Sequence, residues 1–185
     1  PSENPSQNST KPSESNSDNV AVDTVKIGVM LPLSTSQDGS EMIKTLVDIF
    51  VEAINTTDSD LNLPFHDVEG LPNLGGAKVE VVYGDTGATA DVCMTEVERL
   101  ITSENVDIIC GAFSSANTKT SMVPAEKYNK IIISEGTSVS LLEAGYTNFF
   151  RTFPGDDTFV QQSFEFIKSM NEAKNAGIKT LAVVC

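Results

Sequence analysis

Two short polar loops carry most of the side chains that are suited to chemistry in this chain of 185 residues. One loop begins at residue 111, after an apolar run over residues 106–110, and the other begins at residue 135, after an apolar run over residues 130–134. Hydroxyl groups, exposed backbone N–H groups and helix N-termini are suited to binding a small anion such as a carboxylate. The candidate ligand-binding residues are Ser114, Ser115, Gly136, Thr137 and Ser138.

Neither loop places a nucleophile beside a base, so the pattern favours binding over catalysis. The single histidine, His66, lies in a separate stretch rich in turn-forming residues, and one histidine builds neither a zinc site nor a catalytic triad. The segment after the first apolar run, Leu31-Pro32-Leu33-Ser34, lacks the Gly-x-Gly-x-x-Gly pattern of a dinucleotide-binding enzyme. We therefore predict a protein that is no enzyme, with no catalytic residues, no metal and no cofactor.

The three cysteines show neither CxxC spacing nor a metal-binding pattern. Cys93 shares a helical face with Val97 and Leu100, and Cys110 closes an apolar strand. These positions favour buried free thiols. A Cys93–Cys110 disulfide is the alternative.

Composition limits the partners of the protein. A net charge of -14 argues against nucleic acid, whose phosphates such a surface repels. No apolar run approaches the roughly 20 residues that a membrane-spanning helix needs. With 39% hydrophobic residues, the chain can form one globular core of ordinary size.

The two loops must be positioned by strands and helices that alternate along the chain. Residues 25–31 predict a first strand, and residues 41–55 predict a helix with one apolar stripe. Alternation over residues 78–85 predicts a strand at a sheet edge. Thr89 is a candidate N-cap for a helix that runs to Thr102. The apolar runs before the two loops have the composition of strands buried on both faces of a parallel sheet.

The second half of the chain continues the alternation. Pro124 interrupts the helical pattern after the first loop, so this helix is either kinked or begins near Val123. Later segments predict a short helix with a capping box at residues 140–143, an extended run over 148–153, a helix from Thr158 to about Ala176 capped by Gly177, and a strand over 180–185. The order indicates an α/β fold, a doubly wound parallel sheet with right-handed crossovers.

Residues 1–23 are Ser, Asn, Pro, Glu and Lys with few apolar side chains. Such a segment buries too little surface to offset its ordering entropy, so we expect a disordered linker. It is either a terminus without consequence or a tether that holds a folded domain away from a surface.

From residue 25 to residue 185 the chain resembles the branched-chain amino-acid type of periplasmic binding protein, type 1. The segments that carry the resemblance are 25–34, 78–86 with 96–101, 106–115, 133–138 and 149–152. In that family the residues matching Ser115 and Ser138 hold the α-carboxylate of an amino acid. The carbonyl matching Gly136, with the hydroxyl matching Ser138, takes the ammonium. The loop over residues 34–40 lacks the aromatic residue that the family often places over its ligand.

The resemblance also implies a domain organisation. Residues 1–23 would be the linker, 24–148 lobe I, 149–154 the crossing between lobes, and 155–185 the first helix and strand of a truncated lobe II. A second lobe would then supply the rest of the site, including an acidic residue that completes the ammonium site.

The resemblance implies an extracytoplasmic receptor that binds an amino acid, or a similar small carboxylate-bearing solute, between two lobes. It would deliver this solute to the permease of an ABC importer, from the periplasm or from the cell surface as a lipoprotein with an N-terminal lipid anchor. No lipid-modified cysteine stands before the linker in this sequence. The ligand-binding ectodomain of a signalling receptor with the same fold is the alternative.

Overall fold

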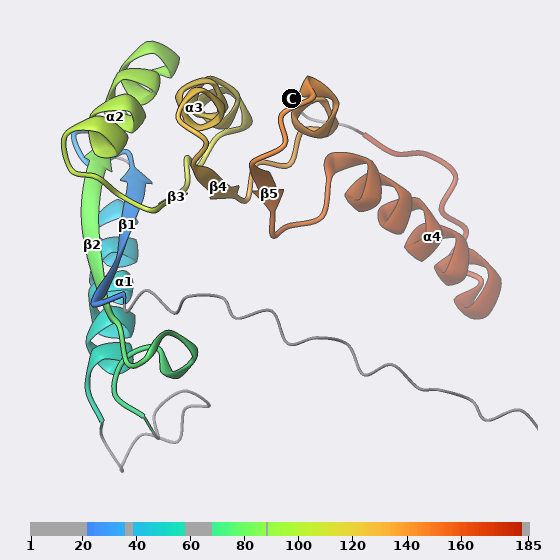
Figure 1. Cartoon of the computed structure of the whole chain (residues 1–185). Coiled ribbons are helices and arrows are strands. Elements are labelled where there is room, and N and C mark those ends of the chain that lie inside the picture. The colour runs from blue at the N-terminus through green and yellow to red at the C-terminus, as the bar shows by residue number, and fades with distance from the viewer. Residues whose placement is uncertain (1–21, 36–38, 58–67, 88, 183–185) are drawn as a thin grey trace, which may run out of the picture.

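Strands and helices alternate along the chain as the sequence predicts (Figure 1). The computed structural model describes residues 22–35, 39–57, 68–87 and 89–182. The expected disorder of residues 1–23 therefore falls almost entirely outside the described residues, as does His66. The elements are β1 (Thr24–Leu31), α1 (Ser40–Asn55), the 3-10 helix η1 (Pro72–Leu74), β2 (Lys78–Asp85), α2 (Ala90–Thr102), β3 (Ile108–Cys110), α3 (Ser115–Lys127), β4 (Ile131–Ser134), the 3-10 helix η2 (Val139–Ala144), β5 (Phe149–Arg151) and α4 (Asp156–Lys174).

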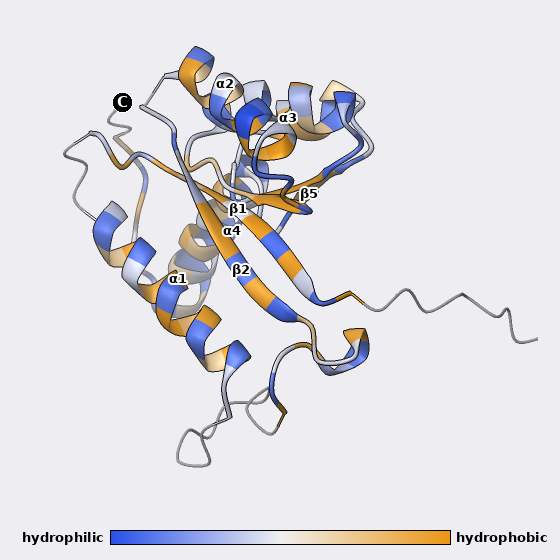
Figure 2. Ribbon diagram, turned by 60° about the vertical axis from the view of Figure 1, so that its left-hand side comes forward, coloured by the Kyte–Doolittle hydropathy of each residue, from blue (hydrophilic) through white to orange (hydrophobic). Residues whose placement is uncertain are grey.

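The five strands form one parallel sheet in the order β2-β1-β3-β4-β5. β2 lies at an edge, as its alternating pattern predicts. The chain moves from β1 to β2 on one side and then returns past β1 to β3 on the other. Figure 2 shows α1 beside β2 on one side of the sheet, and α2 and α3 on the other. The predicted doubly wound α/β fold is confirmed.

The hydrophobic core lies between the sheet and the two helices α2 and α3. Neighbouring strands place Gly28, Ile109, Ile132 and Phe149 in register across this face. Gly28 lets α2 approach closely, because a Cβ there would lie 3.0 Å from a methyl of Leu100 and 3.0 Å from one of Ile109. The buried cluster consists of Met30, Cys93, Val97, Leu100, Ile101, Val106, Ile109, Ala112, Met122, Ala125, Ile132, Leu141 and Phe149.

The opposite face of the sheet is covered only in part. α1 packs along β2, where Ala53 and Val79 are buried. Farther along the sheet, Ile131 is 41% exposed and Phe150 is 54% exposed. The apolar runs thus predict strands correctly, but their burial on both faces is wrong for the described structure, since α1 reaches only one edge.

The helix after the sheet begins earlier than the sequence predicts. α4 starts at Asp156, whose backbone N–H donates to the carbonyl of Thr137 at 3.0 Å, and this contact ties the helix start to the second loop. Thr158 consequently lies inside the helix and does not cap it. At the other end, the helix is capped by Asn175 in the left-handed conformation, two residues before Gly177, at which the sequence predicts the cap.

Three other details depend on the structure. α3 runs continuously through Pro124, so the helix does not begin at Val123. Thr89 stands at the N-cap position of α2 but makes no side-chain cap hydrogen bond. Residues 180–182 form no strand, because no described strand lies beside them, and the rest of that predicted strand is outside the described residues. No helix in the described part of the chain has the length and apolar character to span a membrane.

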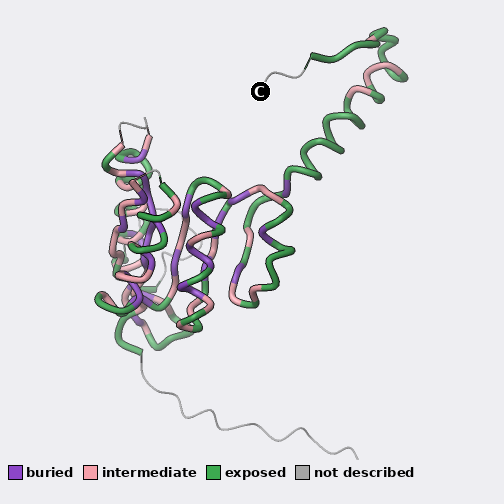
Figure 3. The backbone as a smooth tube through the Cα atoms, turned by 90° about the horizontal axis from the view of Figure 1, so that it is seen from above, coloured by how far each residue is buried: buried purple, intermediate pink, exposed green. Residues whose placement is uncertain are grey.

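The residues after the sheet should be the first part of the chain to open. Figure 3 shows α4 extending away from the sheet, and none of its residues is buried. Helices gain most of their stability from packing, which α4 lacks. Hydrogen exchange on the 185-residue chain should therefore show the amides of Phe164 and Phe166 exchanging well before those of Ile109. Equal protection of α4 and β3 would contradict this prediction.

Candidate functional site

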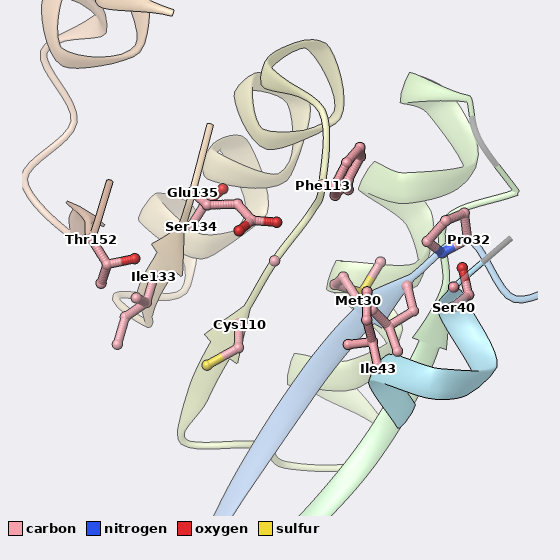
Figure 4. A pocket seen from close by; sticks show the side chains of 13 residues that line it. Met30, Pro32, Ser40, Ile43, Cys110, Phe113, Ile133, Ser134, Glu135 and Thr152 are labelled. Atoms are coloured by element: carbon pink, nitrogen blue, oxygen red, sulfur yellow. The ribbon is translucent and has the colours of Figure 1, made fainter. Parts of the chain in front are cut away.

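A pocket of about 300 Å³ lies at the carboxyl edge of the sheet (Figure 4). The chain order places it at the switch point between β1 and β3, where open α/β sheets bind ligands. Much of its wall is apolar. The lining residues are Met30, Leu31, Pro32, Gly39, Ser40, Ile43, Cys110, Gly111, Phe113, Ile133, Ser134, Glu135 and Thr152.

A second hollow of about 410 Å³ adjoins the first. It is lined by Phe113, Ser114, Ser115, Glu135, Thr137 and Phe153. Phe113 and Glu135 line both spaces, so the two are neighbours, the first mostly apolar and the second rich in hydroxyl groups.

The hydroxyl-rich side contains the N-terminus of α3. Ser114 is the N-cap, and its hydroxyl accepts a hydrogen bond from the backbone N–H of Asn117 at 3.2 Å. The preceding N–H groups of Ser115 and Ala116 have no hydrogen-bond partner among the described residues. Unpaired N–H groups at a helix N-terminus favour a negatively charged group.

Ser115 and Ser138 are brought into direct contact. The hydroxyl of Ser115 accepts a hydrogen bond from the backbone N–H of Ser138 at 3.1 Å. A hydroxyl that accepts one bond still has its own proton to donate. The hydroxyl of Ser138 lies 2.9 Å from that of Ser140, at the surface. The two loops therefore meet on one side of the site.

A buried hydrogen-bond network holds both loops in place. The hydroxyl oxygens of Thr118 and Ser134 are 2.8 Å apart. The carbonyl oxygen of Ala112 lies 2.9 Å from the Thr118 hydroxyl and 3.1 Å from the Ser134 hydroxyl. The backbone N–H of Gly136 donates to the hydroxyl of Ser134 at 3.1 Å. Thr118 thus connects α3, the end of β3 and the end of β4.

Gly136 and Arg151 shape the second loop. A Cβ at Gly136 would lie 2.7 Å from a methyl of Leu141 and 3.1 Å from the hydroxyl of Thr118, so a larger residue at this buried position would have to displace the Leu141 side chain. The guanidinium of Arg151 donates to the carbonyl of Thr137 at 3.2 Å and to that of Ser138 at 3.4 Å. These two carbonyl groups therefore already accept hydrogen bonds from Arg151 within the chain.

The two cysteines lie on opposite faces of the sheet. Cys93 is buried in the core beneath α2, and Cys110 lines the pocket on the other face. Both thiols are free, which excludes the disulfide alternative. Cys110 is only half-buried, and burial raises the pKa of its thiol, so it remains protonated near neutral pH.

The loop after β1 is hydrogen-bonded to Asp85, the last residue of β2. Burial opposes ionisation of Asp85, but hydrogen bonds from the side chain of Ser34 and from the backbone N–H groups of Gly87, Ser34 and Leu33 outweigh it and lower the pKa of this carboxyl. Asp85 is therefore charged at neutral pH. These hydrogen bonds hold the start of the loop next to Leu31 and Pro32, which line the pocket.

The predicted residues take different positions in the site. Ser114, Ser115 and Thr137 line the second hollow, whereas Gly136 and Ser138 line neither space. The sequence interpretation missed the apolar side and Glu135. The sequence contained a signal for these residues. Pro32 and Glu135 directly follow predicted strands, and the carboxyl ends of parallel strands lie at the same edge of a sheet.

The chain belongs to the periplasmic binding protein family, whose family description matches residues 24–184. The class predicted from the sequence is thereby confirmed. Comparison with curated proteins gives no match.

Solved structures of ABC-transporter substrate-binding proteins share this fold. The protein from Desulfitobacterium hafniense in complex with Leu is 18% identical, with a TM-score of 0.61 over 80% of this chain and 39% of that chain. LivJ, the branched-chain amino acid transporter substrate-binding protein of Streptococcus pneumoniae, in complex with isoleucine, is 21% identical, with a TM-score of 0.55 over 71% and 34%. A solute-binding protein from Rhodopseudomonas palustris, in complex with 3,4-dihydroxybenzoic acid, is 19% identical, with a TM-score of 0.55 over 71% and 32%. The chain thus spans less than two fifths of each of these proteins.

Proposed function

We propose that this chain is lobe I of an extracytoplasmic receptor that binds a small carboxylate-bearing solute and delivers it to an ABC importer. Lobe I would cover residues 24–148, the crossing residues 149–154, and the beginning of lobe II residues 155–185. The receptor is a binding protein and not an enzyme. Its partners are the solute and the permease, and a lipid anchor before the linker over residues 1–23 would attach it to the membrane.

One observation carries this proposal: the unpaired N–H groups of Ser115 and Ala116 stand beside the joined hydroxyl loops, at the switch point of the sheet. This geometry suits a carboxylate, which accepts hydrogen bonds from N–H groups and hydroxyls. Family membership and the solutes bound by the structural neighbours, two amino acids and an aromatic acid, support the same class of ligand.

Removing either serine hydroxyl in the full-length receptor should weaken solute binding. A hydrogen bond to a charged group contributes about 1.5–3 kcal/mol, so Ser115→Ala should lower affinity about 10- to 150-fold. We expect a smaller loss for Ser138→Ala, because Ser138 lines neither space and stands behind Ser115, to whose hydroxyl its backbone N–H donates. Isothermal titration calorimetry would measure both, with L-leucine, L-isoleucine and 3,4-dihydroxybenzoate as probes.

The two variants should differ in stability, which separates binding from folding. Ser115→Ala removes the acceptor for the N–H of Ser138 and should lower the free energy of unfolding by about 1 kcal/mol. Ser138→Ala loses only an exposed hydroxyl contact, so its stability should change by less than about 0.5 kcal/mol. Ser103→Ala, exposed at the far end of α2, is the control. Unaltered affinity in both site variants would place the ligand elsewhere.

A further inference from the structure

Glu135 is the only charged side chain that lines either of the two adjoining spaces in the described part of the site. It follows directly after β4, and Figure 4 shows its carboxylate directed toward the middle of the pocket. The side chain is exposed and makes no hydrogen bond or ion pair within the described residues. Its negative charge is therefore available to a ligand.

The rest of the site has the opposite electrostatic preference. The N-terminus of α3 and the hydroxyl of Ser115 favour a negative group on the solute. Glu135 disfavours a second negative group nearby and favours a positive one. The ring of Phe113, which lines both spaces with Glu135, adds an aromatic wall of the kind that attracts cations. The site is thus polarised.

We infer that Glu135 is the specificity-determining residue that binds a cationic group of the solute and selects zwitterions over simple carboxylates. This inference rests on the proposed function and extends it, because it divides the solute class into amino acids and acids without an ammonium group. The solute would direct its carboxylate toward α3, its ammonium toward Glu135, and its apolar part toward Met30 and Ile43.

The test uses the full-length receptor and compares the wild type with Glu135→Gln. Thermal shift with the twenty standard L-amino acids, 3,4-dihydroxybenzoate and 4-methylpentanoate first identifies which probes bind. Calorimetry then measures the strongest amino acid and its 2-hydroxy acid, in which a hydroxyl replaces the ammonium. Glu143→Gln is the matched control, since Glu143 is exposed in η2 and lines neither space.

Glu135→Gln should lower affinity for the amino acid about 10- to 150-fold and leave or raise affinity for the 2-hydroxy acid. Glu143→Gln should change neither. Unchanged affinity for the amino acid in Glu135→Gln, or an equal loss for both probes, would overturn the inference. Wild-type binding of carboxylates alone would overturn it while leaving the proposed function intact. A wild type that binds no probe would overturn both.

Discussion

Replacing Ile132 by alanine should lower the free energy of unfolding by about 2–5 kcal/mol. Ile132 is 0% exposed and lies in register between Ile109 and Phe149, on the strand that packs against α3. Truncation loses the transfer free energy of the removed methyl groups and leaves a cavity that the packed neighbours fill only partly. Urea denaturation of the 185-residue chain would show the loss as a lower midpoint with an unchanged slope.

The matched control is Ile131→Ala, which makes the same change one residue earlier on the same strand. Ile131 faces the other side of the sheet and is 41% exposed, so much of its side chain gains nothing from burial. Its replacement should cost no more than about 1–2 kcal/mol. Equal losses for both variants would mean that both faces of β4 are covered, contrary to the described structure.

Thr118→Val should destabilise the chain by about 1–3 kcal/mol and also weaken solute binding in the full-length receptor. Valine keeps the shape of threonine but removes the hydroxyl that lies 2.9 Å from the carbonyl of Ala112 and 2.8 Å from the hydroxyl of Ser134. The site is fully buried, so water cannot replace the lost bonds. Because the network joins the ends of β3 and β4, both binding loops should loosen.

Thr102→Val separates this effect from the general cost of a valine in a helix. The hydroxyl of Thr102 donates only to the carbonyl of Glu98 in its own helix, at an exposed position. Its replacement should change stability by less than about 0.5 kcal/mol and leave affinity unaltered. If Thr118→Val behaves like Thr102→Val in urea denaturation and in calorimetry, the network does not position the loops.

Local patterns along the chain determined the elements and the class of fold. Apolar runs such as 130–134 become strands, and the loops after them contain the hydroxyls, because strand length and turn chemistry depend on near neighbours. The alternation of strands and helices allows few arrangements other than a parallel sheet with crossovers. For the same reason, the meeting of the 111 and 135 loops at one edge could be predicted from the chain order.

The tertiary structure alone decided how each residue of those loops is used. The backbone N–H of Ser138 donates to the hydroxyl of Ser115, 23 residues away, and Gly136 packs against Leu141. Neither residue lines the open space. Glu135, which looks like a loop residue in the sequence, is aimed into the pocket. Such details follow from contacts between distant segments, whose geometry depends on strand order and side-chain packing, and no local pattern encodes them.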